Sequence, residues 1–214
     1  MRHTLFITLG LLTACPNPYR DDVEEDTGPV EDTDADTDTD TDADTDSDTD
    51  TDTDTDADLE IYGAAPSSPV AAPEFVATNL DGSPRTRSNL LGHRTILWFY
   101  PLTGSEESTL EGTHFQRVSA DLAALDVKIV GVSWGSSGEA DAWAREEGFH
   151  YELWSESSNH RLAETYGADS PSSLPRQVSA LLDRDGSLVL EYRSVTPADH
   201  PHQVLADAAA LWGR

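Results

Sequence analysis

The residues best placed for chemistry in this chain lie between positions 95 and 113, in the stretch TILWFYPLTGSEESTLEGT. The hydroxyl side chains of Ser105 and Ser108 stand at the predicted start of a helix, shortly after a predicted buried strand. The first turn of a helix leaves backbone N–H groups without partners, so it can bind an anion or a polarised oxygen. The stretch contains no thiol, because the only cysteine of the 214 residues is Cys15.

Two predicted elements must position these hydroxyls. Residues 96–100 are an apolar run rich in aromatic and branched side chains that stops at Pro101, which predicts a strand buried on both faces of a parallel sheet. From 105 to 125, apolar residues recur three, four or five positions apart, which predicts a helix with one apolar face. Ser105 is the predicted N-cap, and the two glutamates that follow it suit the positive end of the helix dipole.

The rest of residues 70–214 alternates predicted strands and helices. An N-terminal hairpin with an Asp-Gly turn is predicted between 73 and 88, further strands at 127–133, 151–154, 178–182 and 188–192, and further helices at 139–147, 158–166 and 201–212. This order predicts an α/β fold, namely a thioredoxin-like three-layer sandwich with a mixed central sheet and an N-terminal hairpin.

The stretch 95–113 resembles the active-site loop of the peroxiredoxins, the alkyl hydroperoxide reductase and thiol-specific antioxidant type, most closely the bacterioferritin comigratory protein branch. The shared residues are Phe99-Tyr100-Pro101, Thr109 and Glu111. Ser105 stands at the family's threonine, Ser108 at its peroxide-reducing cysteine, and Thr113 where many members carry a resolving cysteine. Segments 72–75, 80–82, 130–133, 163–167 and 182–186 also resemble the family, in the family's order.

The resemblance further implies an arginine beside the reactive thiolate, on the strand that precedes the turn at 183–186. Counting back along this chain, that position falls on Gln177, and Arg176 is its neighbour. Because a shift of one residue moves a strand side chain to the other face, the sequence leaves open whether Arg176 reaches the pocket. The predicted degenerate site therefore consists of Pro101, Ser105, Ser108, Arg176 and Gln177.

The chemistry of the family needs a thiolate that attacks the peroxide, becomes a sulfenic acid and is recycled by another thiol. A serine hydroxyl is scarcely ionised near neutral pH, so the sequence predicts that the chain alone is inactive as a thioredoxin-dependent peroxidase. One hypothesis is a non-catalytic pseudoenzyme that binds a ligand or protein partner. The alternative is an accessory component of a thiol-dependent peroxide detoxification system, in which a thiol oxidoreductase partner supplies the sulfur.

A serine hydrolase is disfavoured, since His114 lies six residues after Ser108 on nearly the opposite helix face and no Gly-x-Ser-x-Gly elbow is present. Near the last predicted helix, Asp199, His200 and His202 offer potential copper or zinc ligands. Metal sites need three or four converging ligands, so a solvated helix start is expected instead. No metal and no cofactor is predicted. Among the tryptophans, Trp134 is the one expected to face the site.

Residues 1–15 have a basic start, a short apolar core and the ending Leu-Thr-Ala-Cys, which resembles a bacterial lipobox. They predict a lipoprotein signal peptide, with Cys15 acylated and inserted into membrane lipid, and an extracytoplasmic protein. An ordinary secretory signal with a chance cysteine is the alternative. Pro16 is not the aspartate of the common inner-membrane retention signal, which favours the outer membrane.

Residues 16–69 are predicted to be a disordered acidic tether, because the Thr-Asp repeat from 21 to 60 has almost nothing to bury and repels itself. Residues 1–69 carry 21 acidic and 2 basic side chains, against 41 and 13 for the whole chain, whose net charge is −28. Without a basic stripe, nucleic acid is excluded as a partner. The repeat lacks the glycine and the terminal glutamate of a calcium loop. Whether its threonines are modified stays open.

Overall fold

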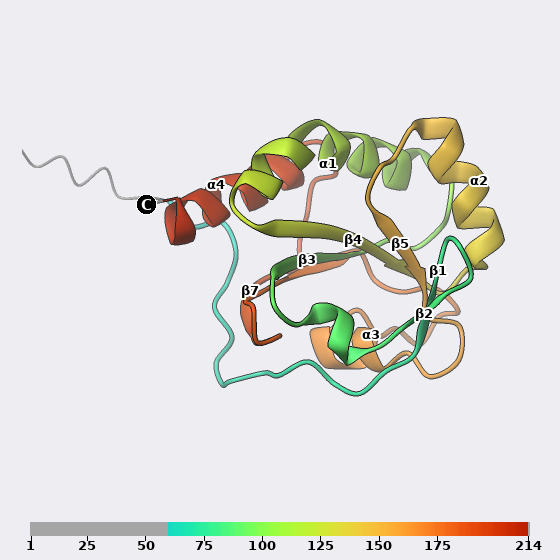
Figure 1. Cartoon of the computed structure of the whole chain (residues 1–214), viewed down its shortest axis with the longest axis horizontal. Helices are drawn as coiled ribbons and strands as arrows, with labels where there is room; N and C mark the ends of the chain where they lie inside the picture. The colour runs from blue at the N-terminus through green and yellow to red at the C-terminus, as the bar shows by residue number, and fades with distance from the viewer. Residues whose placement is uncertain (1–59, 214) are drawn as a thin grey trace, which may run out of the picture. The chain divides into compact units, whose positions relative to one another are not determined.

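The computed structural model describes residues 60–213, so the predicted signal peptide with Cys15 and most of the predicted tether lie outside the described residues. The strands form one mixed sheet in the order β2-β1-β5-β4-β3-β6-β7 (Figure 1). The central strands β3, β4 and β5 are parallel, whereas β1, β2, β6 and β7 join antiparallel to their neighbours. The bounds are β1 (Ala77–Asn79), β2 (Pro84–Arg85), β3 (Arg94–Phe99), β4 (Val127–Ser133), β5 (Glu152–Ser155), β6 (Val178–Leu182) and β7 (Leu188–Tyr192).

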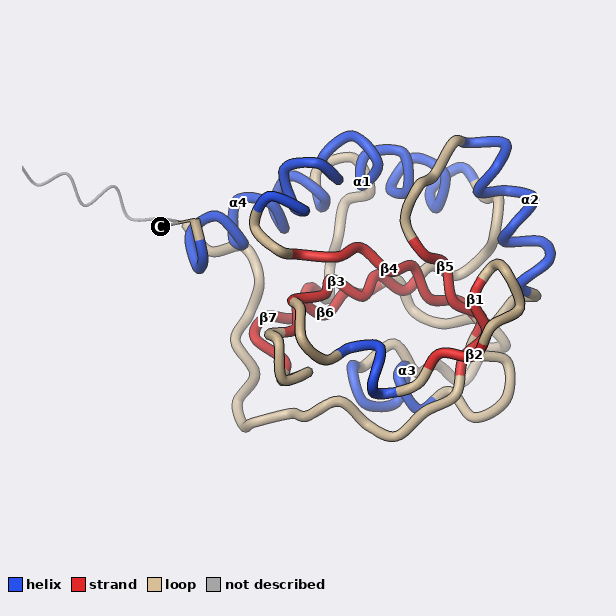
Figure 2. The backbone as a smooth tube through the Cα atoms, viewed as in Figure 1, coloured by secondary structure: helices blue, strands red, loops and turns tan. Residues whose placement is uncertain are grey.

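Helices cover both faces of the sheet, as the three-layer prediction requires (Figure 2). On one face lie α1 (Glu106–Ala124), α2 (Ser137–Glu147) and α4 (His200–Trp212), and on the other lie α3 (Arg161–Tyr166) and the short 3₁₀ helix η1 (Arg87–Leu90). Among residues 60–213, none of the helices combines the length and apolar composition needed to cross a bilayer. The thioredoxin-like α/β fold is therefore confirmed.

The central strand β3 contributes to two cores at once. Ile96 and Trp98 belong to the core under α1, whereas Leu97 and Phe99 belong to the core on the α3 side, and all four are fully buried. This arrangement is expected of a parallel strand covered on both faces. The backbone of β4 approaches this strand closely at Gly131, where an added Cβ would lie 2.5 Å from Leu153 Cδ2 and 3.0 Å from the Trp98 ring.

The predicted elements agree with the structure apart from small shifts at their ends. The N-terminal hairpin is shorter than predicted, because β1 and β2 span only 77–79 and 84–85 and η1 takes residues 87–90. The helix α3 begins at Arg161 instead of the predicted position 158. The cause is local, because His160 adopts a left-handed conformation with φ 48° and a right-handed helix cannot include it. The helix ends at Gly167, which is also left-handed, as the sequence predicts.

The predicted boundary between tether and domain at residue 70 needs correction, because residues 62–64 are already packed on the domain. Ala64 and Glu191 of β7 exchange backbone hydrogen bonds of 2.9 and 2.8 Å. The N–H groups of Tyr62 and Gly63 donate to the buried carboxylate of Asp207 in α4, at 2.9 and 2.8 Å. Local sequence could not reveal this contact, since its acceptor lies at the far end of the chain.

Candidate functional site

The start of α1 holds the two hydroxyls that the sequence singled out. Ser105 is the N-cap, as predicted, and its Oγ accepts a hydrogen bond of 3.2 Å from the N–H of Ser108. The Ser105 hydroxyl in turn donates to Ser108 Oγ at 2.8 Å. Ser108 is fully buried. The first turn of α1 therefore fixes both hydroxyls against each other.

No general base accompanies Ser108 among residues 60–213, where its only side-chain hydrogen bond is the one with Ser105. His114 lies elsewhere: its Nδ1 is 2.7 Å from the carbonyl oxygen of Ala198, and its Nε2 is 3.1 Å from Arg117. A serine nucleophile needs a base within hydrogen-bond reach. The geometry of the described residues thus agrees with the argument from sequence against a serine hydrolase.

A buried polar group lies one turn further along α1, at Glu111. Its carboxylate is 1% exposed and accepts a 2.6 Å hydrogen bond from Gln177 Nε2 and a 2.7 Å hydrogen bond from His200 Nδ1. The His200 ring packs edge-on against Phe115 and Tyr192, with centroid distances of 5.4 and 5.1 Å. A buried carboxylate needs such partners, because an unpaired charge in the interior is strongly destabilising.

His200 corrects one prediction. The segment around Asp199 and His202 was expected to be a solvated helix start, but the His200 side chain is fully buried. The reason is the packing of α4 on α1, which points the first residue of α4 at Glu111 while His202 stays exposed. The hydrogen bond joins residues 89 positions apart, so no local pattern could have identified it. Residues 60–213 contain no cluster of three or more potential metal ligands.

The question about Arg176 is decided by the register of β6. Val178 pairs with Phe99, which places Gln177 beside the end of β3 where Pro101 follows. Gln177 turns inward to Glu111, whereas Arg176 is exposed. Of the five predicted site residues, Ser105 and Ser108 meet directly, and Gln177 bonds to Glu111, one turn further along α1. Pro101 lines the adjacent hollow, and Arg176 is exposed.

A hollow of about 250 Å³ lies at the carboxyl ends of β3 and β4. Its walls combine the apolar Pro101, Leu102 and Leu174 with the polar side chains of Thr103, Ser133 and Glu139. Leu102 and Leu174 are 54% and 39% exposed. Trp134, expected to face the site, instead stacks on His160 with ring centroids 3.8 Å apart. The hollow is thus a small, partly apolar cavity next to the loop that leads into α1.

Burial shifts the pKa values of two titratable groups, Tyr100 and Glu156, that the sequence did not single out. Burial raises the pKa of Tyr100, which lies at the end of β3. Burial also raises the pKa of the fully buried Glu156 to about 7, although its carboxylate accepts hydrogen bonds of 2.7 and 3.3 Å from the N–H groups of Leu162 and Ala163. Glu156 therefore caps the start of α3 from within the core.

Comparison with known proteins agrees with the resemblance seen in the sequence. Residues 70–191 match the AhpC/TSA family. Peroxiredoxin Bcp from Xanthomonas campestris is 28% identical over 122 residues, which are 54% of this chain and 76% of that protein. Peroxiredoxin Bcp from Escherichia coli is 22% identical over 141 residues, which are 63% of this chain and 90% of that protein.

Solved structures show the same fold. The Xanthomonas campestris bacterioferritin comigratory protein, described for its alkyl peroxide reduction activity, is 25% identical with a TM-score of 0.59, over 64% of this chain and 91% of that chain. A cysteine-to-serine mutant of peroxiredoxin Q from the same organism is 24% identical with a TM-score of 0.62, over 70% of this chain and 98% of that chain. These similarities confirm the predicted relationship and fold.

Proposed function

Because the chain belongs to the AhpC/TSA family, we propose that it is a peroxiredoxin-like protein in which Ser108 replaces the peroxide-reducing cysteine. It would then bind a ligand or a protein partner and not reduce peroxide by itself. The observation that carries this proposal is the fully buried Ser108 hydroxyl in the first turn of α1, held by Ser105, in a domain without any cysteine after position 15. A hydroxyl cannot follow the thiolate oxidation steps.

The hollow at the ends of β3 and β4 supports a binding role. Its exposed Leu102 and Leu174 offer apolar contact, and the nearby hydroxyls of Thr103 and Ser133 offer hydrogen bonds. Apolar walls with a few polar groups are typical of ligand sites. A volume of about 250 Å³ accommodates a small ligand or one side chain of a partner.

Peroxide consumption tests the proposal. A fragment that begins at Glu60 keeps the packed residues 62–64 and removes Cys15, so any thiol in it is an introduced one. We expect no turnover of hydrogen peroxide or cumene hydroperoxide by this fragment with thioredoxin and its reductase, and turnover after Ser108→Cys. Ser172→Cys, at an exposed loop position, adds a thiol outside the first turn of α1 and should stay inactive. Turnover by the unchanged fragment would refute the proposal.

The alternative role, as an accessory component of a thiol-dependent peroxide detoxification system, makes a different prediction. A thiol oxidoreductase partner would supply the sulfur, and the exposed leucines at the hollow would form part of the contact. Wild type would then increase peroxide turnover only when mixed with a cysteine-bearing partner recovered with it. Leu102→Asp should abolish both the recovery and the increase.

We also propose that Cys15 is acylated, which anchors the protein to membrane lipid outside the cytoplasm, with the outer membrane as the favoured location. The support is the lipobox-like ending of residues 1–15. Growth with an alkyne-labelled fatty acid should label the full chain and leave the Cys15→Ser variant unlabelled. Equal labelling of both would contradict the anchor.

A further inference from the structure

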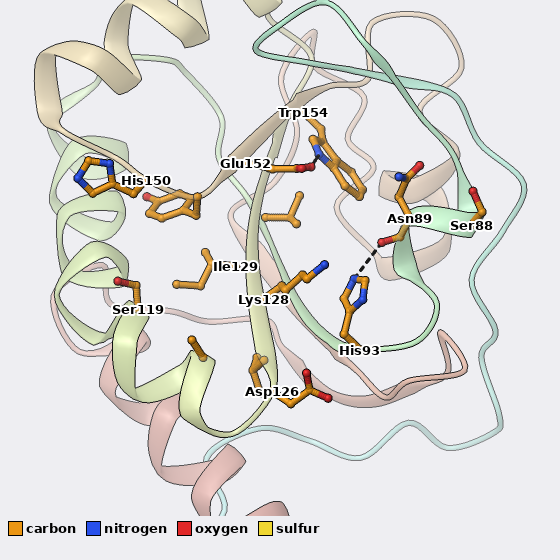
Figure 3. Close-up of a pocket in the computed structure, with 14 residues that line it drawn as sticks. Ser88, Asn89, His93, Ser119, Asp126, Lys128, Ile129, His150, Glu152 and Trp154 are labelled. Atoms are coloured by element: carbon orange, nitrogen blue, oxygen red, sulfur yellow. Dashed lines mark hydrogen bonds between the residues drawn. The ribbon is translucent and has the colours of Figure 1, made fainter.

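A second and larger hollow lies at the opposite end of the parallel strands from Ser108. Its volume is about 590 Å³, and its walls come from residues 88–93, from α1, from residues 126–130 and from residues 150–154 (Figure 3). None of these residues belongs to the site around Ser108. A volume of this size is within the usual range for ligand sites.

The hollow runs along a part of β4 that lacks a strand neighbour on one side. On its other side, β4 pairs with β3 from Val127 to Val132. On the side of the hollow, β5 begins its pairing only at Val130, opposite Glu152. Backbone groups alternate between the two sides of a strand, and the carbonyl oxygens of Asp126 and Val132 accept hydrogen bonds on the β3 side. Within the described part of the chain, Val127 and Ile129 therefore turn free N–H and C=O groups to the hollow, along an edge about 10 Å long at roughly 3.3 Å per residue. Such an edge offers backbone hydrogen bonds to an added strand.

Among the described residues of this edge, the charged side chain without an ion-pair partner is a lysine. Lys128 is the only lysine of the chain, its side chain is exposed, and it forms no ion pair within residues 60–213. The two carboxylates of the hollow form ion pairs with arginines: Asp126 pairs with Arg184 at 2.7 Å and Glu152 with Arg85 at 2.9 Å. Glu152 also lies close enough to Lys128 to interact with its charge, but the two groups form no ion pair. An incoming carboxylate would therefore meet an ammonium group that no carboxylate within residues 60–213 holds in an ion pair.

The side chains on the two sides of the hollow favour an extended ligand over a compact one. Ser119 and Ala123 of α1 lie on one face of the sheet, the face to which Val127 and Ile129 also turn. Lys128 alternates with them and turns to the opposite face, where Asn89 and His93 lie (Figure 3). The space thus lies in the plane of the sheet and opens to both faces, which suits a strand whose side chains alternate between them.

We propose that the free edge of β4 at residues 127–129 binds a short extended peptide segment as an added strand. Acidic side chains of the segment face Lys128, and small or β-branched side chains face Ala123 and Ser119. Hydrogen bonds between the backbones fix the register of the peptide, and the contact between its carboxylate and Lys128 favours acidic peptides over others. This inference is independent of the function proposed for Ser108, because the hollow lies at the other end of the strands.

The test uses the full chain and the capped peptide Val-Glu-Val-Glu-Val as probe. Binding should slow amide hydrogen exchange at Val127 and Ile129, whose N–H groups face the hollow. Lys128→Gln should weaken binding roughly fivefold, the size expected for one partly exposed charge contact. Arg145→Gln removes the same charge on the exposed side of α2 and should leave the affinity unchanged. Ala123→Trp fills the hollow from an exposed helix position and should abolish binding without altering the unfolding midpoint.

Three further probes complete the test. The peptide Val-Lys-Val-Lys-Val should not bind, and the glutamate peptide with N-methylated backbone should not bind, because it cannot pair with the edge. Sodium glutarate should not protect residues 127–129. Equal binding by any of these three, an unchanged affinity in Lys128→Gln, or a glutamate peptide that leaves the exchange at Val127 and Ile129 unchanged would overturn the proposal.

Discussion

The buried hydrogen bond between Glu111 and His200 joins α1 to α4, and its removal should be among the most destabilising changes in the domain. In His200→Leu, the Glu111 carboxylate keeps only the neutral donor Gln177 at 2.6 Å, in a place where its side chain is 1% exposed. Leaving a buried carboxylate without one of its hydrogen-bond partners costs at least about 3 kcal/mol. For a domain of this size that corresponds to a fall in Tm of roughly 10 °C.

A double variant distinguishes the loss of the Glu111–His200 hydrogen bond from the loss of packing around His200. Glu111→Leu with His200→Leu removes both polar groups and fills the space with apolar atoms, while the half-buried Gln177 can turn to water. Replacing both partners is far less costly than breaking the pair. We therefore expect the double variant to be more stable than His200→Leu alone, with a coupling of at least about 2 kcal/mol.

Urea unfolding followed by tryptophan fluorescence measures these differences, since Trp98 and Trp154 are buried and report on both cores. His202→Leu is the matched control, because His202 lies in the same turn of α4 but is exposed, and it should change the free energy of unfolding by less than about 0.5 kcal/mol. A loss below about 1 kcal/mol in His200→Leu, or single-variant effects that simply add, would refute the reasoning.

Three further predictions follow from buried groups and close contacts. Burial raises the pKa of Glu156 from 4.5 to about 7, so the contribution of its protonated form to stability is fully present below pH 4.5 and is lost as pH rises through 7. The free energy of unfolding of the domain should therefore fall by about 3 kcal/mol between pH 4.5 and 8. The free energy of unfolding of Glu156→Gln should depend less on pH. Gly131→Ala should cost about 1–3 kcal/mol in urea unfolding, since its Cβ would lie 2.5 Å from Leu153, whereas Gly138→Ala, with no atom within 4 Å, should be neutral or slightly stabilising. Asp207→Asn replaces one of the two oxygens that accept from the Tyr62 and Gly63 N–H groups, and it should speed the hydrogen exchange of one of these groups at least tenfold, while Asp199→Asn should not. Unchanged exchange would mean that residues 62–64 are held by other contacts.

The elements of the fold were largely predictable because each depends on neighbours in sequence. The strand bounds of β4, β6 and β7 follow from short apolar runs, and the start of α1 follows from Ser105 as N-cap before two glutamates. The start of α3 could not be predicted in the same way. Its first turn depends on the left-handed conformation of His160 and on hydrogen bonds to the buried Glu156, and local periodicity reveals neither.

The sequence predicted the two hydroxyls of the candidate site but not the buried hydrogen bonds of Glu111 with Gln177 and His200. Ser105 and Ser108 are three residues apart on one helix, so their contact is a local one. Gln177, Glu111 and His200 come from separate elements that meet only after the sheet and α4 have packed. The sequence left the choice between Arg176 and Gln177 open. Strand side chains alternate between the two faces, but without the partner strand the sequence does not show which of the two residues faces inward.

By itself, the sequence determined that this domain has no thiol, that its strands and helices alternate as in a thioredoxin-like fold, and that two hydroxyls stand at the start of α1, with Ser105 as its N-cap. These conclusions rest on residue chemistry and local spacing. The tertiary structure decided that Arg176 faces outward, that His200 is buried on Glu111, that residues 62–64 belong to the domain, and that β4 keeps a free edge beside Lys128. The physical reason is that burial and strand pairing are properties of segments that meet only after folding.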